Sequence, residues 1–225
     1  MATTLRSSVL WEVVDLILTK EKWNKALADR HGEEVQKKFS SATVAICGLG
    51  GLGSNIAVSL ARAGVGRLVL IDFDRVDLSN LHRQQYKADQ MGRYKTDALC
   101  ENLKKIAPYA AIVTHTERIT EVNAVELLKD ADIICEAFDN AECKAMLANI
   151  VLEALPKKYL IAASGMAGLG SANEIQTRRV SEYFYLCGDE TSDVAEGSLI
   201  ASRVMLCAAH QAHMVLRILA DRFEN

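Results

Sequence analysis

The feature that most constrains the fold is a glycine-rich turn, Gly48-Leu49-Gly50-Gly51-Leu52-Gly53, which separates two patterned segments. The apolar, β-branched run at 44–47 is typical of a buried parallel strand, and a helical pattern follows at 55–63. A second apolar run at 68–71 ends in Asp72. Strand, glycine turn, helix, strand and acid in this order predict a βαβ unit that binds a nucleotide.

The glycines and the acid each have a physical role in such a unit. Gly48 allows a tight turn, Gly50 lets the backbone approach a phosphate, and Gly53 lets the helix pack closely on the strand. The free N–H groups at the start of the helix favour an anion. Asp72 lies about 20 residues beyond Gly53, the spacing expected for a carboxylate that binds ribose hydroxyls.

The segment after Asp72 argues against the dinucleotide NAD as the ligand. It is too polar for a plain linker, with the amide of Asn80, the guanidinium of Arg83 and several carboxylates. A triphosphate under attack needs such groups, because its leaving pyrophosphate gathers negative charge. Lys95 begins a predicted helix that runs to residue 106, at the end that disfavours a cation. A bound phosphate would satisfy both the helix and the lysine.

GLGGLG, the segment DFDRVDLSNLHRQ and the lysine of GRYKT together resemble the ThiF/MoeB/HesA family, the bacterial relatives of ubiquitin-activating enzymes. The resemblance is strong over residues 30–139. It implies an adenylyltransferase that uses ATP and Mg²⁺ on the C-terminal carboxylate of a small ubiquitin-like sulfur-carrier protein. The rest of the chain is similar to a short ThiF-like subgroup, which favours a ThiS-like carrier and thiamine biosynthesis.

The resemblance also assigns site residues. The residues expected to contact the nucleotide are Gly48, Gly50, Gly51, Gly53, Asp72, Asp74, Ser79, Asn80, Arg83, Lys95, Asp139 and Asn140. Arg83, Lys95 and Asp139 are also expected to assist the reaction, with Asp139 as the Mg²⁺ ligand. Asp139 follows a predicted strand at 131–138, where open α/β sheets bind ligands. Asp139 or Asn140 could instead cap the helix predicted at 141–155.

The apolar spacing ahead of the first strand predicts a helix over 4–39. We therefore divide the chain into an N-terminal helical segment, 1–40, and a nucleotide-binding adenylyltransferase domain, 41–225. In the resembled family the N-terminal helices lie across a homodimer, and an arginine there can reach the partner's ATP. Arg30 is the candidate, although a solvated helix charge is an equal alternative.

The remaining pattern predicts a Rossmann-like, doubly wound α/β fold with a mainly parallel sheet, helices on both faces and antiparallel strands near the C-terminal end. Further strands are expected at 110–116, 159–164, 174–178 and 183–186, and further helices at 120–128, with Thr120 as N-cap, and 198–223. The last helix is expected to pack under the sheet or at a dimer interface. A second glycine-rich stretch, 165–170, precedes a strand pattern and is interpreted as a turn beside the substrate channel.

The cysteines fit a reducing compartment. Several of the six lie inside apolar patterns, and there is no C-x-x-C pair, so the structural zinc found in many family members is not expected. Cys187 is predicted to end a strand, and some relatives use a cysteine in that region for a covalent intermediate. Nearby Asp189 and Glu190 would raise its pKa, which favours a structural cysteine as the alternative.

Composition narrows the partners and the location. A net charge of −3 gives no basic field for nucleic acid or an anionic membrane. No apolar run approaches the ~18 residues of a membrane span, and no signal pattern opens the chain, so we expect a cytoplasmic protein. The alternatives are another carrier, such as the molybdopterin synthase small subunit, a tRNA carboxylate, a non-catalytic nucleotide-binding adaptor, or an NAD-dependent dehydrogenase.

Overall fold

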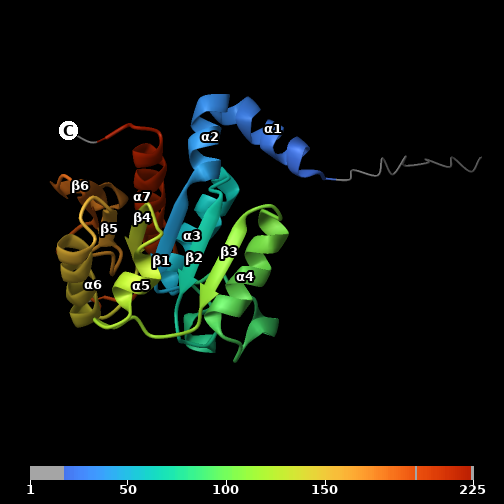
Figure 1. The fold of residues 1–225 in the computed structure, drawn as a ribbon. Coiled ribbons are helices and arrows are strands. Elements are labelled where there is room, and N and C mark those ends of the chain that lie inside the picture. Colours follow the sequence, from blue (N-terminus) through green and yellow to red (C-terminus); the bar gives the residue numbers. More distant parts are fainter. Residues whose placement is uncertain (1–17, 196, 224–225) are drawn as a thin grey trace, which may run out of the picture.

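A seven-stranded sheet forms the centre of the molecule, which a computed structural model describes for residues 18–195 and 197–223 (Figure 1). The strand order is β3-β2-β1-β4-β5-β7-β6, and every neighbouring pair is parallel except β6 with β7. The strands are β1 (Thr43–Cys47), β2 (Arg67–Ile71), β3 (Ala111–His115), β4 (Ile133–Glu136), β5 (Tyr159–Ala163), β6 (Gln176–Ser181) and β7 (Phe184–Gly188). This confirms the predicted doubly wound α/β class.

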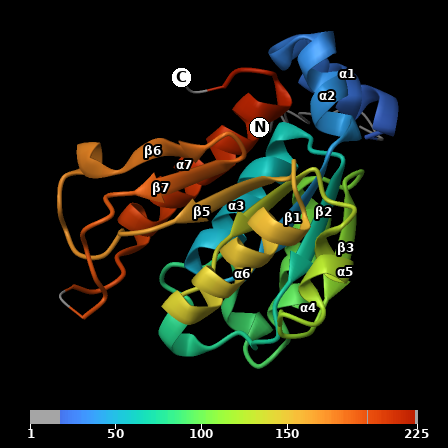
Figure 2. The same ribbon diagram turned by 60° about the vertical axis from the view of Figure 1, so that its left-hand side comes forward.

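Helices cover both faces of the sheet (Figures 1 and 2). The helices of the two layers are α3 (Gly51–Ala63), α4 (Lys95–Ile106) and α7 (Ala201–Leu219) on one face, and α5 (Ala124–Leu128) and α6 (Ala141–Ala154) on the other. Leu60 and Val215 belong to the first core and Leu147 to the second. Within residues 18–195 and 197–223, no helix is long and apolar enough to cross a membrane.

The parallel strands determine where a site can form. The central strands β1 and β2 are buried on both faces, which explains why they read as continuous apolar runs. Parallel strands end at the same edge of a sheet, so the segments that follow β1, β2, β4, β5 and β7 meet there. These segments contain both glycine-rich stretches and the polar residues Asp72 and Asp139.

The predicted N-terminal helix over 4–39 is interrupted in the described part of the chain. Two helices are present, α1 (Lys20–His31) and α2 (Glu33–Ser41), and Gly32 between them has a φ of 88° that ends the first helix. Arg30 is exposed in the last turn of α1. Residues 4–17 of the prediction lie outside the described residues.

Three other helices differ from their predicted boundaries. Helix α3 begins at Gly51 instead of residue 55, because the glycines themselves form its first turn. Thr120 is not the N-cap of α5: the side chain of Asn123 accepts the N–H of Thr120 at 2.7 Å, and the helix starts at Ala124. Helix α7 is shorter than predicted at both ends, and it packs on α3, β5, β6 and β7.

Candidate functional site

The glycine turn after β1 is built by close backbone contacts. Gly48 has a φ of 91°, and a Cβ there would lie 2.8 Å from the carbonyl oxygen of Ala137 in the segment after β4. A Cβ on Gly53 would lie 1.8 Å from the carbonyl oxygen of Gly48. Gly50 precedes α3 and supplies no side-chain cap to its first turn. The first turn of α3 therefore offers backbone N–H groups to an anion.

Asp72 ties this turn to the segment after β2. Its Oδ2 accepts the N–H of Leu49 at 2.6 Å, and its Oδ1 accepts the N–H of Asp74 at 2.7 Å. Burial raises the pKa of Asp72, while Lys95 and these two N–H groups oppose that increase. A carboxylate has about four acceptor positions, so two remain for other donors. The predicted ribose contact stays a prediction.

Lys95 meets a carboxylate of its own chain. Its buried Nζ donates to Asp74 Oδ2 at 2.8 Å, at the start of α4. The anion that offsets the cation at the wrong end of this helix is therefore Asp74, where the sequence argument placed a phosphate. The same contact joins Lys95, through Asp74 and Asp72, to the glycine turn. A phosphate contact for Lys95 and a nucleotide contact for Asp74 remain predictions.

Arg83 lies against the glycine turn. A Cβ on Gly51 would be 3.4 Å from Arg83 Cγ, and the guanidinium donates to Asn80 Oδ1 at 2.6 Å and to the carbonyl of Ser79 at 3.4 Å. The Ser79 hydroxyl itself donates to Asp77. The structure thus brings Arg83 and Asn80 together beside the start of α3. Their contacts with a nucleotide remain predictions.

Gln84 is a residue at this turn that the sequence analysis missed. It is buried, its Nε2 lies 3.8 Å from where a Cβ on Gly50 would be, and its buried Oε1 has no partner among the described residues. Nothing in the sequence distinguishes this glutamine from Gln85 beside it.

The segment after β4 separates the two roles that the sequence left open. The side chain of Asn140 accepts the N–H of Cys143 at 2.9 Å and caps α6. The exposed Asp139 precedes it, and Ala137, two residues earlier, contacts Gly48. Asp139 is thus carried by a segment that packs directly on the glycine turn. Its role as Mg²⁺ ligand remains a prediction.

A partly buried ion pair supports this segment, and the sequence analysis missed it. Glu136 at the end of β4 is 1% exposed; its Oε2 accepts from Lys144 Nζ at 2.9 Å and its Oε1 from the N–H of Phe138 at 2.6 Å. Lys144 also donates to the carbonyl of Ala163 at the end of β5. Burial raises the pKa of Glu136, against the effect of Lys144. An acid within an apolar strand is the signal that predicts such a partner.

Cys187 does not have the surroundings that a reactive thiol needs. It is the penultimate residue of β7, which continues to Gly188, and it is fully buried in the core that α7 covers. Burial raises the pKa of the thiol to about 11, although the hydroxyl of Thr177, 3.5 Å from Sγ, opposes the change. Cys187 thus lies near the strand end as predicted, but its side chain is buried and not exposed in a polar loop, which favours the structural alternative. A catalytic role for Cys187 remains a prediction.

The predicted Mg²⁺ site names Asp139 as its protein ligand. Within residues 18–195 and 197–223, no cluster of three or more histidine, cysteine, aspartate or glutamate side chains could hold a metal ion. Mg²⁺ in nucleotide sites uses one or two carboxylates together with substrate phosphates. The exposed carboxylate of Asp139, in the segment that packs on the glycine turn, is a ligand of that type.

The sheet order and the glycine turn define a doubly wound α/β protein of the nucleotide-binding kind. The chain matches the ThiF family over residues 24–225 and belongs to that family. The expected resemblance is thereby confirmed.

Curated relatives share part of their length with this chain. The adenylyltransferase and sulfurtransferase MOCS3 of Caenorhabditis briggsae is 38% identical over 125 residues, which cover 55% of this chain and 31% of the relative. The adenylyltransferase and sulfurtransferase UBA4 of Lodderomyces elongisporus is 28% identical over 195 residues, which cover 84% and 42%. The chain therefore spans less than half the length of both relatives.

Solved structures share the fold. The E. coli tRNA N6-threonylcarbamoyladenosine dehydratase TcdA in complex with ATP has a TM-score of 0.80 at 20% identity, over 92% of this chain and 98% of that one. E. coli MccB with ATP has a TM-score of 0.67 at 23% identity, over 84% and 59%. At these identities the likeness concerns the fold.

Proposed function

We propose that this protein is an ATP-dependent adenylyltransferase, which activates a carboxylate as an acyl adenylate and releases pyrophosphate. The observation that carries the proposal is that the segments after two strands, β2 and β4, both contact the glycine turn that follows β1. Asp72 bonds to Leu49, the Arg83 stem lies on Gly51, and the segment with Asp139 packs on Gly48. The names of the MOCS3 and UBA4 relatives support adenylyl transfer.

In the proposed reaction, a carboxylate oxygen of the substrate attacks the α-phosphorus of ATP. The bond from that phosphorus to the bridging oxygen of the β-phosphate breaks, and its electrons leave with pyrophosphate. No general base is required, because a carboxylate is already ionised at pH 7. The N–H groups of α3 would hold phosphate oxygens, and Arg83 with Asn80 would stabilise the charge that develops on them.

Further groups complete the proposed site. Asp72 would accept from the ribose hydroxyls, and Asn140 would contact the nucleotide beside its capping role. Lys95, which Asp74 now holds, would turn to the phosphates when they bind. Asp139 would hold Mg²⁺, which neutralises phosphate charge in this chemistry. Ser79 would contribute to the nucleotide contacts from the segment that carries Asn80.

For the substrate we propose the C-terminal Gly-Gly carboxylate of a small ubiquitin-like sulfur carrier, with a ThiS-like carrier of thiamine biosynthesis favoured and the molybdopterin synthase small subunit as the next candidate. The word sulfurtransferase in the names of the relatives supports a sulfur carrier. We also propose a cytoplasmic homodimer, in which Arg30 on α1 would reach the partner's nucleotide. A tRNA carboxylate is disfavoured by the net charge of −3.

The proposal is tested by pyrophosphate release from ATP and Mg²⁺ with purified Gly-Gly carriers and with tRNA. We expect release with a carrier, and a loss of about 10²–10³ in rate for Arg83→Ala, the effect of removing one charge donor from a transition state. Arg62→Ala is the matched control, because Arg62 is exposed in the last turn of α3, away from the glycine turn. Undiminished release by folded Arg83→Ala would contradict the role of Arg83.

Calorimetry separates the remaining classes. We expect ATP to bind the purified protein and NADH to bind much more weakly. Tighter binding of NADH would favour a dehydrogenase. Binding of ATP and a carrier without pyrophosphate release would favour a non-catalytic adaptor. Release with tRNA alone would replace the carrier by an RNA substrate.

A further inference from the structure

The sheet order divides its carboxyl edge into two halves. The chain runs from β1 through α3 to β2 on one side and from β4 through α6 to β5 on the other, so the strand order reverses between β1 and β4. Ligands of open α/β sheets lie at this reversal. With the nucleotide over β1, β2 and the end of β4, a second reactant would meet it from the side formed by β5 and β7.

The second glycine-rich stretch, residues 165–170, follows β5 on that second half, and we call it the second glycine loop. A Cβ on Gly165, whose φ is 78°, would lie 2.1 Å from Asp189 Oδ1. A Cβ on Gly170 would lie 2.7 Å from Glu174 Oε2 and 3.1 Å from Arg203 Nη2. These glycines therefore leave space for charged side chains of the protein, and the loop is shaped around them.

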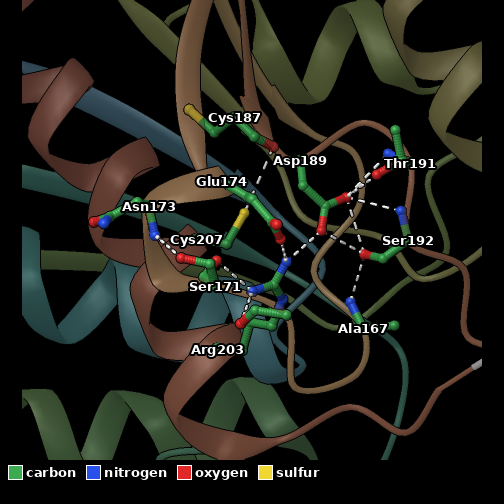
Figure 3. Close-up of polar contacts among 11 residues, drawn as sticks. Ala167, Ser171, Asn173, Glu174, Cys187, Asp189, Thr191, Ser192, Arg203 and Cys207 are labelled. Atoms are coloured by element: carbon green, nitrogen blue, oxygen red, sulfur yellow. Dashed lines mark hydrogen bonds and ion pairs between the residues drawn. The ribbon is translucent and has the colours of Figure 1, made fainter.

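Asp189 and Arg203 form a buried ion pair at the centre of this arrangement (Figure 3). Their side chains are 4% and 6% exposed, and Arg203 Nη2 lies 2.5 Å from Asp189 Oδ2. Arg203 Nη1 donates to the carbonyls of Gly170 and Ser171 at 2.6 and 2.8 Å. A buried pair adds little net stability compared with apolar packing, but it fixes the positions of the groups that it joins.

The carboxylate side of the pair holds the loop from its other end. Asp189 accepts the N–H groups of Thr191 and Ser192 and the Ser192 hydroxyl, and Ser192 Oγ accepts the N–H of Ala167 at 2.9 Å. Figure 3 shows these contacts converging from separate segments of the chain. The N–H of Asp189 also donates to the carbonyl of Gly165 at 3.0 Å, so Asp189 holds the start of the second glycine loop and Arg203 holds its end.

The same helix turn touches the nucleotide half. Val204, next to Arg203 in the first turn of α7, would be 2.8 Å from a Cβ on Gly51. His82, beside Arg83, contacts the carbonyl of Leu199 at 3.2 Å. The start of α7 therefore contacts the first glycine turn through Val204 and the second glycine loop through Arg203.

We propose that Arg203 is a positioning residue, which with Asp189 shapes the second glycine loop into the wall that receives the carboxylate-bearing substrate of the proposed adenylation. The inference rests on the proposed function for the identity of the substrate. The positioning of the loop by the ion pair does not depend on the proposed function, so an experiment can contradict the substrate and still support the role of the ion pair.

Hydrogen–deuterium exchange tests the shaping directly. We expect Arg203→Met to increase the rate of exchange at least tenfold in residues 165–171 and 189–192, while residues 44–60 keep their protection. Calorimetry should show an ATP affinity within threefold of that of the parent protein. Arg203→Lys, which keeps the charge but loses the fork of donors, should give a smaller increase. The control is Arg178→Met, which removes an exposed ion pair with Glu190, the neighbour of Asp189. Unchanged exchange in both loops would overturn the proposal.

Pyrophosphate release with the Gly-Gly carrier tests the substrate side. We expect Arg203→Met to raise the KM for the carrier at least tenfold and the KM for ATP less than threefold. Arg203→Lys should raise the KM for the carrier less than Arg203→Met does. Arg178→Met should leave both KM values unchanged. Equal increases in both KM values would show a general loss of structure and overturn the specific role. No release by the parent protein with any carrier would overturn the proposed substrate, and the exchange result would still decide the shaping.

Discussion

The two glycine-rich stretches follow buried strands and lie at the same edge of the sheet, but their glycines serve different contacts. In residues 48–53, the missing side chain of Gly53 leaves room for the backbone of Gly48, and α3 begins within the stretch, at Gly51. In residues 165–170, the missing side chain of Gly165 leaves room for the carboxylate of Asp189. A single 3-10 turn, Ala172–Glu174, and then β6 follow this stretch. A glycine-rich pattern thus indicates that another group packs closely on the backbone, but it does not indicate whether that group is backbone or side chain. The next element of the chain, helix or strand, distinguishes the two cases.

The largest expected effect is on the second stretch. Arg203→Met leaves Asp189 as an unpaired buried charge, and breaking a buried pair costs about 3–5 kcal/mol of the free energy of unfolding. Urea denaturation measures this loss. Arg203→Met combined with Asp189→Asn should recover part of it, because no charge is left buried and the amide oxygen can still accept the N–H groups of Thr191 and Ser192. A cost below about 1 kcal/mol for the single variant would contradict the buried pair.

The next effect separates the two stretches by ligand binding. Gly53→Ala and Gly165→Ala should each cost about 1–3 kcal/mol of stability, because both place a Cβ where an atom already lies. Gly53→Ala should also weaken ATP binding, whereas Gly165→Ala should leave it nearly unchanged. Gly168→Ala, with a φ of 74° and open space around the added Cβ, is the control at about 1 kcal/mol. Equal losses of ATP affinity would remove the distinction.

The buried carboxylates of the two regions should respond to pH in opposite directions. Burial tends to raise the pKa of Asp189, but the N–H groups of Ser192 and Thr191 and the Arg203 guanidinium outweigh it and hold this pKa well below its usual range. Its stabilisation is present above the unfolded pKa of about 4 and is lost as the pH falls further. Glu136 has a raised pKa, so its contribution is greatest below about pH 4 and is lost as the pH rises through its folded pKa.

Urea denaturation between pH 3 and 8 checks these signs, with about 1.4 kcal/mol expected for each unit of pKa change. Asp189→Asn should flatten the acid side of the stability profile. Glu136→Gln should lose less stability than the parent protein as the pH rises from 4 to 7. Parallel profiles for the parent and both variants would contradict the opposite shifts.

The smallest effect is expected at the exposed pair beside the second stretch. Arg178 and Glu190 are 2.7 Å apart but 53% and 38% exposed, so Arg178→Met should change stability by less than about 1 kcal/mol. High salt should remove any such difference, because exposed charges are screened. A salt-independent loss of several kcal/mol of stability would contradict the expectation that the exposed pair contributes much less than the buried Arg203–Asp189 pair.

The strands and the first turn could be predicted because their signals lie in neighbouring residues. Residues 44–47 and 68–71 are apolar and β-branched, and each proved to be part of a central strand. The ends of elements were less predictable: Gly51 begins a helix, and β7 continues through Cys187 to Gly188. Pairing with β5 and β6 sets the length of β7, and no local pattern contains that information.

The candidate site was predictable in its residue types and less so in its contacts. Asp72, Arg83 and Asp139 lie near the glycine turn because each is carried by a segment that leaves the same edge of one parallel sheet. That Lys95 pairs with Asp74 could not be read from the sequence, since several anions were available to it. An acid in an apolar strand, Glu136, indicates that a cationic partner is present, but the sequence does not identify Lys144 as that partner.

By itself the sequence determined the doubly wound α/β class, the glycine turn and the family, because side-chain periodicity and the freedom of glycine are properties of contiguous residues. The tertiary structure alone decided how deeply Cys187 is buried, which carboxylate holds Lys95 and that Arg203 meets Asp189. Those outcomes depend on distances between residues far apart in the chain, and such distances exist only once the sheet has assembled.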